Sequence, residues 1–383
     1  MRLDLYGGFG EKGRTCLGVE SAGFRLLLDA GVKTSAYGHD DYYPAIHRQE
    51  LSAIDAIVVT HAHEDHLAAL GWCIAGGFRG RIFMTAETQR EADACLASYA
   101  TADEHARVRA ALIERLPVRG TALALGPFRI QTGRSGHMGG AVWCNLADDC
   151  VSLDYCGDIV PSSPVFGVDP LPPADAIVID ASYGDDGKTG RERSQEVADW
   201  IEAHPRGCAL PTPLYGRSLE LLALVAGPVA LAPGMREALQ TQTADAVWLV
   251  RGTATRLAAR LAAASDWHVN DAFPEATLLC HDGMGMSGPA RAVLAEAARV
   301  GHPTLFTGHL PAGSPGEQLL ARQQASWIRL PTHPTLAENL ALVASSGAAK
   351  VIGHSCDKPT LAGLRSHLPQ LDATLATGDR VFV

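Results

Sequence analysis

Short apolar runs separated by turn residues dominate the first half of the chain. The run from 56 to 60, Ala-Ile-Val-Val-Thr, is β-branched and bounded by polar residues, which is typical of a buried strand. A stretch rich in Ala, Leu, Glu and Arg from about 86 to 116 predicts helix, and a shorter helix is expected at 67–75. Similar apolar runs predict further strands at 3–6, 16–20, 24–28, 81–84, 123–132, 141–146, 150–155 and 174–179.

The pattern changes after about residue 187, where helical and strand segments alternate. Such alternation predicts a parallel sheet with covering helices, and we expect a second domain over residues 187–331. The last fifty residues give a helix, a strand, a helix and a terminal strand. The fold class indicated is α/β, with layers of helices on strand-rich sheets.

Composition and charge narrow the class of protein. The chain has 383 residues, of which 47% are hydrophobic and 19% charged, as expected for a soluble globular protein. The formal net charge of −10 argues against a surface that coats nucleic acid through a general excess of positive charge.

The nine cysteines form no Cys-x-x-Cys pair, which argues against a zinc ribbon and favours free thiols in a reducing compartment. The first residues lack an apolar core of signal-peptide length, and no apolar stretch is long enough to cross a membrane. We therefore expect a cytoplasmic protein without a membrane partner.

The strand at 56–60 is followed directly by His61-Ala62-His63-Glu64-Asp65-His66. A loop at the carboxyl end of a rigid strand can direct several side chains toward one point. Imidazole nitrogen and carboxylate oxygen are the ligands that zinc uses in catalytic sites. A solvated polar loop is the alternative, but three His and two acidic residues within six positions favour a metal site, with two ligands for each of two ions.

Four more polar residues follow predicted strands: His137, Asp158, Asp180 and His354. Taken singly, a His or Asp at the end of a strand is usually a turn former or a satisfied hydrogen-bonding residue. Their order after His-x-His-x-Asp-His resembles that of the metallo-β-lactamase fold. The resemblance implies two Zn²⁺ ions, with Mn²⁺ as an alternative, and a carboxylate, Asp29, that orients the ligand loop. It assigns His61, His63 and His137 to one ion, Asp65, His66 and His354 to the second, and Asp158 to both.

The second half resembles the β-CASP nucleases, a branch of that fold that processes RNA. The similarity is carried by Asp180-Ala181-Ser182-Tyr183-Gly184, by Gly216-Arg217-Ser218-Leu219-Glu220-Leu221-Leu222, by 285–290, by 304–309 and by Pro331-Thr332-His333-Pro334. It implies a metallo-β-lactamase αββα sandwich with an inserted α/β β-CASP domain. The sandwich would comprise residues 1–186 and a return segment, 332–383.

The implied activity is hydrolysis of single-stranded nucleic acid by a hydroxide activated by two metals. His333, oriented by Asp180, would protonate the leaving oxygen, with Asp65 as a third catalytic residue. In the family, a His such as His354 at the last motif goes with RNA, so RNA is the expected partner and DNA the less favoured one. The predicted substrate contacts are Ser182, Arg134, Arg217, Arg256 and Arg260.

Departures from the family pattern keep alternatives open. Thr307-Gly308-His309 replaces Thr-Gly-Tyr, His354-Ser355-Cys356 replaces His-Gly-Glu, and the Asp of the usual Ser-Ala-His-Ala-Asp is missing after His333. Residues 187–331 carry thirteen Lys and Arg against thirteen Asp and Glu, so the insert has no basic excess for a polynucleotide. A hydrolase of a small ester or phosphodiester is the second hypothesis, a non-catalytic partner protein is the third, and a homodimer is an open alternative.

Overall fold

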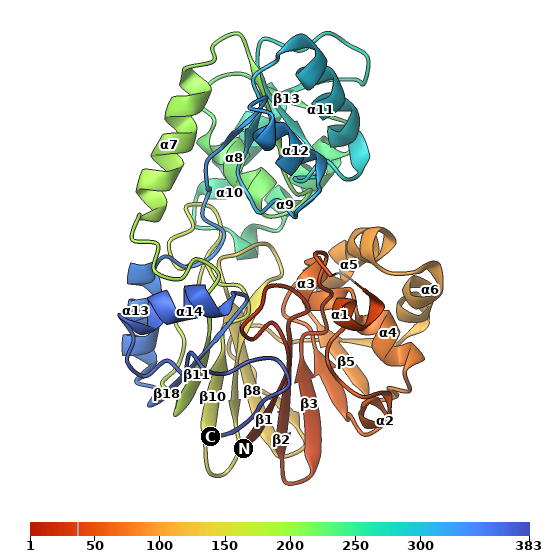
Figure 1. Ribbon diagram of the computed structural model, residues 1–383, viewed down its shortest axis with the longest axis vertical. Coiled ribbons are helices and arrows are strands. Elements are labelled where there is room, and N and C mark those ends of the chain that lie inside the picture. The colour runs from red at the N-terminus through yellow and green to blue at the C-terminus, as the bar shows by residue number, and fades with distance from the viewer. Residues whose placement is uncertain (37) are drawn as a thin grey trace. The chain divides into compact units, whose positions relative to one another are not determined.

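The computed structural model of the chain describes residues 1–36 and 38–383 (Figure 1). It divides into two compact units. The first unit comprises Met1–Pro161, Val168–Gly187 and His333–Val383, and the second comprises Ser162–Gly167 and Lys188–Thr332. The first unit therefore contains both ends of the chain, which lie close together in Figure 1.

One sheet of the first unit has the strand order β19-β1-β2-β3-β4-β5-β6. Strands β19 to β3 pair antiparallel, and β3 to β6 pair parallel. The carboxyl ends of β3 and β4 therefore lie at the same edge, where Asp29 and the His61–His66 loop follow. The bounds are β1 (Arg2–Gly7), β2 (Cys16–Ser21), β3 (Phe24–Leu28), β4 (Ala56–Val58), β5 (Arg81–Met84), β6 (Ile113–Arg115) and β19 (Arg380–Phe382).

The other sheet of this unit has the order β18-β11-β10-β9-β8-β7. Strands β10, β11 and β18 pair parallel, with Asp180 opposite His354, so their carboxyl ends also meet at one edge. The bounds are β7 (Leu123–Leu125), β8 (Phe128–Arg134), β9 (Val142–Ala147), β10 (Ser152–Tyr155), β11 (Ala176–Asp180) and β18 (Lys350–His354).

The two sheets face each other, and helices cover their outer faces. Phe24 of β3 and Phe128 of β8 pack edge to face with ring centroids 6.2 Å apart. Figure 1 shows α4, α5 and α6 on one flank of the strands and α13 and α14 on the other. The bounds are α1 (His39–Tyr42), α2 (Arg48–Leu51), α3 (Glu64–Leu67), α4 (Leu70–Ala75), α5 (Ala86–Tyr99), α6 (Ala102–Ala110), α13 (Leu336–Ser346) and α14 (Lys358–Arg365).

Two predicted elements are each divided in the structure. The helix expected over 86–116 is α5, α6 and the short edge strand β6, because Thr101 and Glu104 form a capping box that starts a new helix. The strand expected over 123–132 is a hairpin, because Gly126 takes a positive φ of 56° and turns the chain between β7 and β8.

The second unit has a parallel sheet of order β12-β15-β13-β14 and a parallel pair, β16-β17. Its apolar core lies between this sheet and the helices and includes Leu210, Leu222, Leu257 and Leu279. The strand bounds are β12 (Cys208–Pro211), β13 (Val229–Leu231), β14 (Ser265–Asp266), β15 (Thr277–Cys280), β16 (Leu305–Phe306) and β17 (Ser326–Trp327). The helix bounds are α7 (Gly190–Glu202), α8 (Arg217–Leu224), α9 (Met235–Ala244), η1 (Ala246–Trp248), α10 (Thr253–Ala263), α11 (Gly288–Val300) and α12 (Pro315–Ala321).

The α/β class predicted from the sequence is confirmed. Within residues 1–36 and 38–383, no helix has both the length and the hydropathy needed to cross a bilayer.

Candidate metal centre

Four predicted ligands of the first unit converge on one point. His61 and His63 lie between β4 and α3, His137 lies between β8 and β9, and Asp158 follows β10. Each offers a ligand atom, and these four atoms all lie within 4.8 Å of one another. The Nε2 atoms of His61 and His137 are 3.7 and 3.6 Å from Asp158 Oδ2. Such a group of three imidazoles and a carboxylate is a suitable donor set for one divalent cation.

The ligands predicted for a second ion lie farther apart than those predicted for the first. His66 Nε2 lies 3.1 Å from Asp158 Oδ1 and 4.0 Å from Asp65 Oδ2. The His354 ring is farther away, with its centroid 6.2 Å from that of His66. Both its nitrogens contact other groups: Nδ1 lies 2.8 Å from Ser355 Oγ and Nε2 lies 3.1 Å from the Gly157 carbonyl oxygen.

Several buried atoms of these residues lack hydrogen-bond partners within the described chain, which shows whether the residues suit a metal. Within the described residues, His61 Nε2, His66 Nε2 and Asp158 Oδ1 are shielded from solvent and make no hydrogen bond of acceptable geometry. Leaving such atoms unsatisfied is costly, and native proteins rarely do so. A cation bound by these nitrogen and oxygen atoms would satisfy all three, so the residues present suit one.

The charge states of His61 and Asp158 agree with a cation site. Burial would lower the pKa of His66, but Asp158 and Asp29 outweigh burial and raise it, so this imidazole must release a proton to bind a cation. Burial lowers the pKa of His61 well below its ordinary value, which keeps this imidazole neutral and able to donate a lone pair. Burial alone would raise the pKa of Asp158, but the surrounding His66 and His333 hold it well below its usual range. The carboxylate is therefore ionised at neutral pH.

Asp29 fixes the loop that carries the ligands. It follows β3 with a positive φ of 63° and is fully buried. Its carboxylate accepts hydrogen bonds from the Thr60 backbone N–H at 2.7 Å and from the Tyr155 hydroxyl at 2.8 Å. It also lies 2.8 Å from His66 Nδ1, which leaves His66 Nε2 directed at the cluster.

Thr60 and Tyr155 were not predicted as site residues. The Thr60 hydroxyl bonds Asp29 and lies 3.1 Å from His61 Nδ1, and its position beside the His cluster was a usable signal. Tyr155 stacks near His354 with ring centroids 5.6 Å apart. Nothing in its local sequence distinguishes it from an ordinary strand residue, because its role depends on contacts with distant parts of the chain.

A His–Asp pair adjoins the same carboxylate. His333 Nδ1 lies 2.8 Å from Asp180 Oδ2 and 3.6 Å from Asp158 Oδ2. Burial would raise the pKa of Asp180, but the His333 charge and hydrogen bond outweigh burial and lower it. The His333 side chain is 14% exposed, whereas Asp180 is fully buried. A partly exposed imidazole held by a buried carboxylate can hold or transfer a proton.

The Asp180 carboxylate also orders the neighbouring chain. Its Oδ1 accepts a hydrogen bond from the Ser182 N–H at 3.0 Å, and the Tyr183 ring lies edge-on to His333 at 5.1 Å between centroids. Asn339 of α13 donates to the Asp180 carbonyl oxygen at 3.0 Å. The predicted substrate residue Ser182 therefore lies beside the His–Asp pair.

Two arginines predicted to contact substrate are engaged by the fold itself. Arg134 donates to both oxygens of Asp169 through Nε and Nη2, at 3.0 and 2.9 Å. In the second unit, Arg260 donates to the carbonyl oxygens of Val225, Ala226 and Gly227, just beyond the end of α8. Their guanidinium groups therefore have structural roles, and a substrate contact by either stays a prediction.

The other two arginines also belong to the second unit. Arg217, at the start of α8, donates to the Thr332 hydroxyl at 2.9 Å. Arg256 is exposed on α10. A substrate contact by Arg217 or Arg256 therefore stays a prediction.

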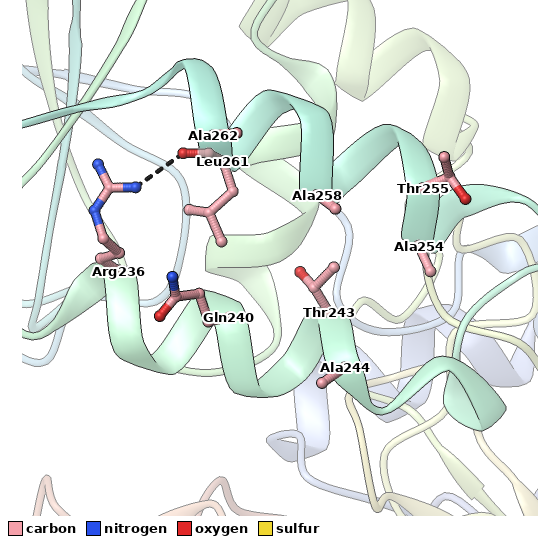
Figure 2. Close-up of a pocket in the computed structure, with 9 residues that line it drawn as sticks. All are labelled: Arg236, Gln240, Thr243, Ala244, Ala254, Thr255, Ala258, Leu261 and Ala262. Carbon is pink, nitrogen blue, oxygen red and sulfur yellow. Dashed lines mark hydrogen bonds between the residues drawn. The ribbon is translucent and has the colours of Figure 1, made fainter.

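A hollow of about 520 Å³ in the second unit lies between α9 and α10 (Figure 2). Small alanine and threonine side chains line most of it, and Arg236 at one end bonds the Leu261 carbonyl oxygen at 2.9 Å. Its lining contains no His, Cys, Asp or Glu. The hollow therefore lacks the ligands and proton-transfer groups found around Asp158.

Comparison with known proteins agrees with this fold and centre. Residues 24–212 match the family model described as a β-lactamase superfamily domain. Transcription termination factor FttA of Cenarchaeum symbiosum is 26% identical over 274 residues, which cover 62% of this chain and 41% of that protein. Endoribonuclease YSH1 of Kluyveromyces lactis is 37% identical over 90 residues, which cover 23% of this chain and 12% of that protein.

A solved structure shares the fold over nearly the whole length. The crystal structure of a protein of unknown function from Enterococcus faecalis V583 has a TM-score of 0.62 and 12% identity, and the match covers 99% of both chains. The αββα sheets and their cluster of His and Asp define a metal-binding protein of the metallo-β-lactamase fold. The resemblance to the β-lactamase superfamily and to its β-CASP branch, predicted from the sequence, is confirmed.

Proposed function

We propose that the protein is a metal-dependent phosphodiesterase that hydrolyses single-stranded RNA. The observation that carries this proposal is the cluster of His61, His63, His137 and Asp158 beside the His333–Asp180 pair. Together they supply ligands for a cation and a proton donor. The similarity to an endoribonuclease supports RNA as the substrate, although the matched parts span less than half of these relatives.

The proposed ligand set has two halves that share Asp158. His61, His63 and His137 hold one ion, and Asp65, His66 and His354 hold the other. When bound, two divalent ions activate a water molecule and stabilise charge on the phosphoryl oxygens. We propose Zn²⁺ because imidazole ligands suit it, with Mn²⁺, which prefers carboxylate and water ligands, as the alternative.

The chain's own residues complete the reaction. In the proposed mechanism, Asp180 holds His333 through Nδ1, so that His333 Nε2 carries the proton for the leaving oxygen of the RNA. Asp65 acts as the remaining catalytic carboxylate through its place in the ligand set. Ser182 lies beside this pair and contacts the substrate. Residues 187–331 form the proposed β-CASP insert; a cytoplasmic location and a homodimer stay predictions from the sequence.

Cleavage of end-labelled single-stranded RNA, beside DNA of the same sequence, tests this function. The metal-loaded chain should cleave RNA faster than DNA, and His63→Ala should abolish both activities. Elemental analysis of the unsubstituted chain should find about two metal ions per chain. If a chain with two metals cleaves neither polymer but hydrolyses bis(p-nitrophenyl) phosphate, the small-ester function replaces the one proposed.

A further inference from the structure

One tryptophan of the second unit is exposed to solvent. Trp327 is 41% exposed, whereas Trp143, Trp248 and Trp267 are buried at 4–7%. It lies on the short strand β17, opposite Phe306 of β16. A large aromatic side chain at a surface has apolar area available for a ligand.

The indole ring is held in one orientation. Its Nε1–H donates to the Gly308 carbonyl oxygen at 2.7 Å. The strand carrying it is tied to β16 through the Ile328 N–H, which donates to the Phe306 carbonyl oxygen at 3.0 Å. A ligand that contacts a ring already fixed in place loses less side-chain entropy on binding.

One guanidinium group adjoins this ring, and a second packs against the peptide that anchors it. Arg329 Cζ lies 5.6 Å from the ring centroid, within the range of a cation–π interaction. The Arg217 guanidinium packs against the Gly308 α-carbon so closely that any larger residue at 308 would collide with it. The peptide that anchors Trp327 is therefore also the peptide against which Arg217 packs.

We propose that Trp327, Arg329 and Arg217 form a binding site for single-stranded RNA on the second unit. A base stacks on the exposed indole, and the two guanidinium groups bind neighbouring phosphates; this inference rests on the proposed function. Stacking platforms flanked by arginine bind single strands with little sequence preference. Since residues 187–331 have equal numbers of basic and acidic residues, a local site of this kind would have to supply affinity that overall charge does not.

The test measures binding in the full chain with His63→Ala, so that the RNA remains intact. Fluorescence anisotropy with a labelled RNA strand should show about 5- to 150-fold weaker binding for Trp327→Ala, the loss expected for one stacked base. Trp327→Phe, which keeps a ring, should lose less. Phe382→Ala, which removes another exposed aromatic ring from the first unit, is the matched control and should bind like the parent.

A strand with abasic sugars separates stacking from charge. Trp327→Ala and the parent should bind this strand equally, because it offers phosphates but no bases. Unchanged affinity of Trp327→Ala for normal RNA would overturn the platform. If light scattering shows that Trp327→Ala changes the oligomeric state while RNA binding is unchanged, Trp327 serves contacts between chains and the platform is likewise overturned. If Trp327→Ala weakens RNA binding but the metal-loaded chain with His63 intact cleaves no RNA, the platform stands and the nuclease function is refuted.

Discussion

Asp154 and Asp158 show how strongly surroundings decide the behaviour of one residue type. Asp158 follows β10 and is ionised among histidines. Asp154 lies within β10, opposite Ile177 of β11. Ile177 belongs to the apolar core that includes residues of α13. Its Oδ1 accepts one hydrogen bond, from Asn145 at 2.8 Å, and its Oδ2 has no partner within the described residues. Burial raises the pKa of Asp154 to about 7.

We expect Asp154→Asn to stabilise the protein, and more so at high pH. The folded state disfavours the charged form of Asp154. The contribution of this carboxyl to stability is therefore fully present below pH about 4, its pKa in the unfolded chain, and is lost as the pH rises toward 7. The free energy of unfolding should rise by about 3–4 kcal/mol at pH 8 and by about 1–2 kcal/mol at pH 5. Urea denaturation at both pH values measures this, with exposed Asp149→Asn as the control. An equal gain at both pH values would contradict the prediction.

His333→Ala should affect substrates according to their leaving group. An RNA phosphodiester releases an alkoxide that needs a proton, so its hydrolysis should fall about 10²- to 10⁴-fold. A p-nitrophenyl ester leaves without a proton and should lose far less. Steady-state rates on both substrates, with exposed His367→Ala as control, measure the difference. Similar losses on both substrates would indicate that His333 positions the substrate rather than donating a proton.

At the scale of elements, strand ends carry the candidate site. The sequence was sufficient to locate these ends, because His61, Asp158, Asp180 and His354 each follow an apolar run. It was insufficient for Tyr155, whose hydroxyl reaches Asp29 across 126 residues of sequence. The prediction of one helix over 86–116 was also wrong, because the high average helix propensity of this stretch concealed the capping residue Thr101, where a second helix starts. Contacts remote in sequence and single capping residues leave little trace in hydrophobic periodicity.

Arg260→Ala tests whether Arg260 stabilises the packing of α10 on the end of α8 or binds the substrate. Removing its bonds to three carbonyl oxygens beyond α8 should lower the free energy of unfolding by about 1–3 kcal/mol. Exposed Arg256→Ala, on the same helix, should change it by less than about 0.5 kcal/mol. Thermal melts and RNA binding should be measured for both variants. Weaker RNA binding by Arg260→Ala at unchanged stability would return this residue to the substrate contacts.

At the scale of the whole molecule, the proposed metal ligands all belong to one of the two units. The first unit builds its centre from segments on both sides of the second unit in sequence. The second unit has its own apolar core, from Val165 to Leu330. Loss of metal should therefore loosen one unit and leave the core of the other intact.

Hydrogen exchange with and without a chelator measures this difference. Metal at about a thousandfold its dissociation constant stabilises the folded state that binds it by about 4 kcal/mol. Chelation should accelerate exchange in peptides covering residues 56–67 and 350–356. Peptides covering 208–211 and 277–280 should exchange as before. Equal acceleration in both sets would show that the two units unfold together.

The return of the chain to its first unit has a consequence for synthesis. His333 and His354 are translated long after His61, with the whole second unit in between. A nascent chain that has already paired strands β1 to β6 still lacks the proposed proton donor and the last ligand. The proposed nuclease, built in this order, stays incomplete on the ribosome, beside the messenger RNA that encodes it, until the segment that carries His333 and His354 has emerged.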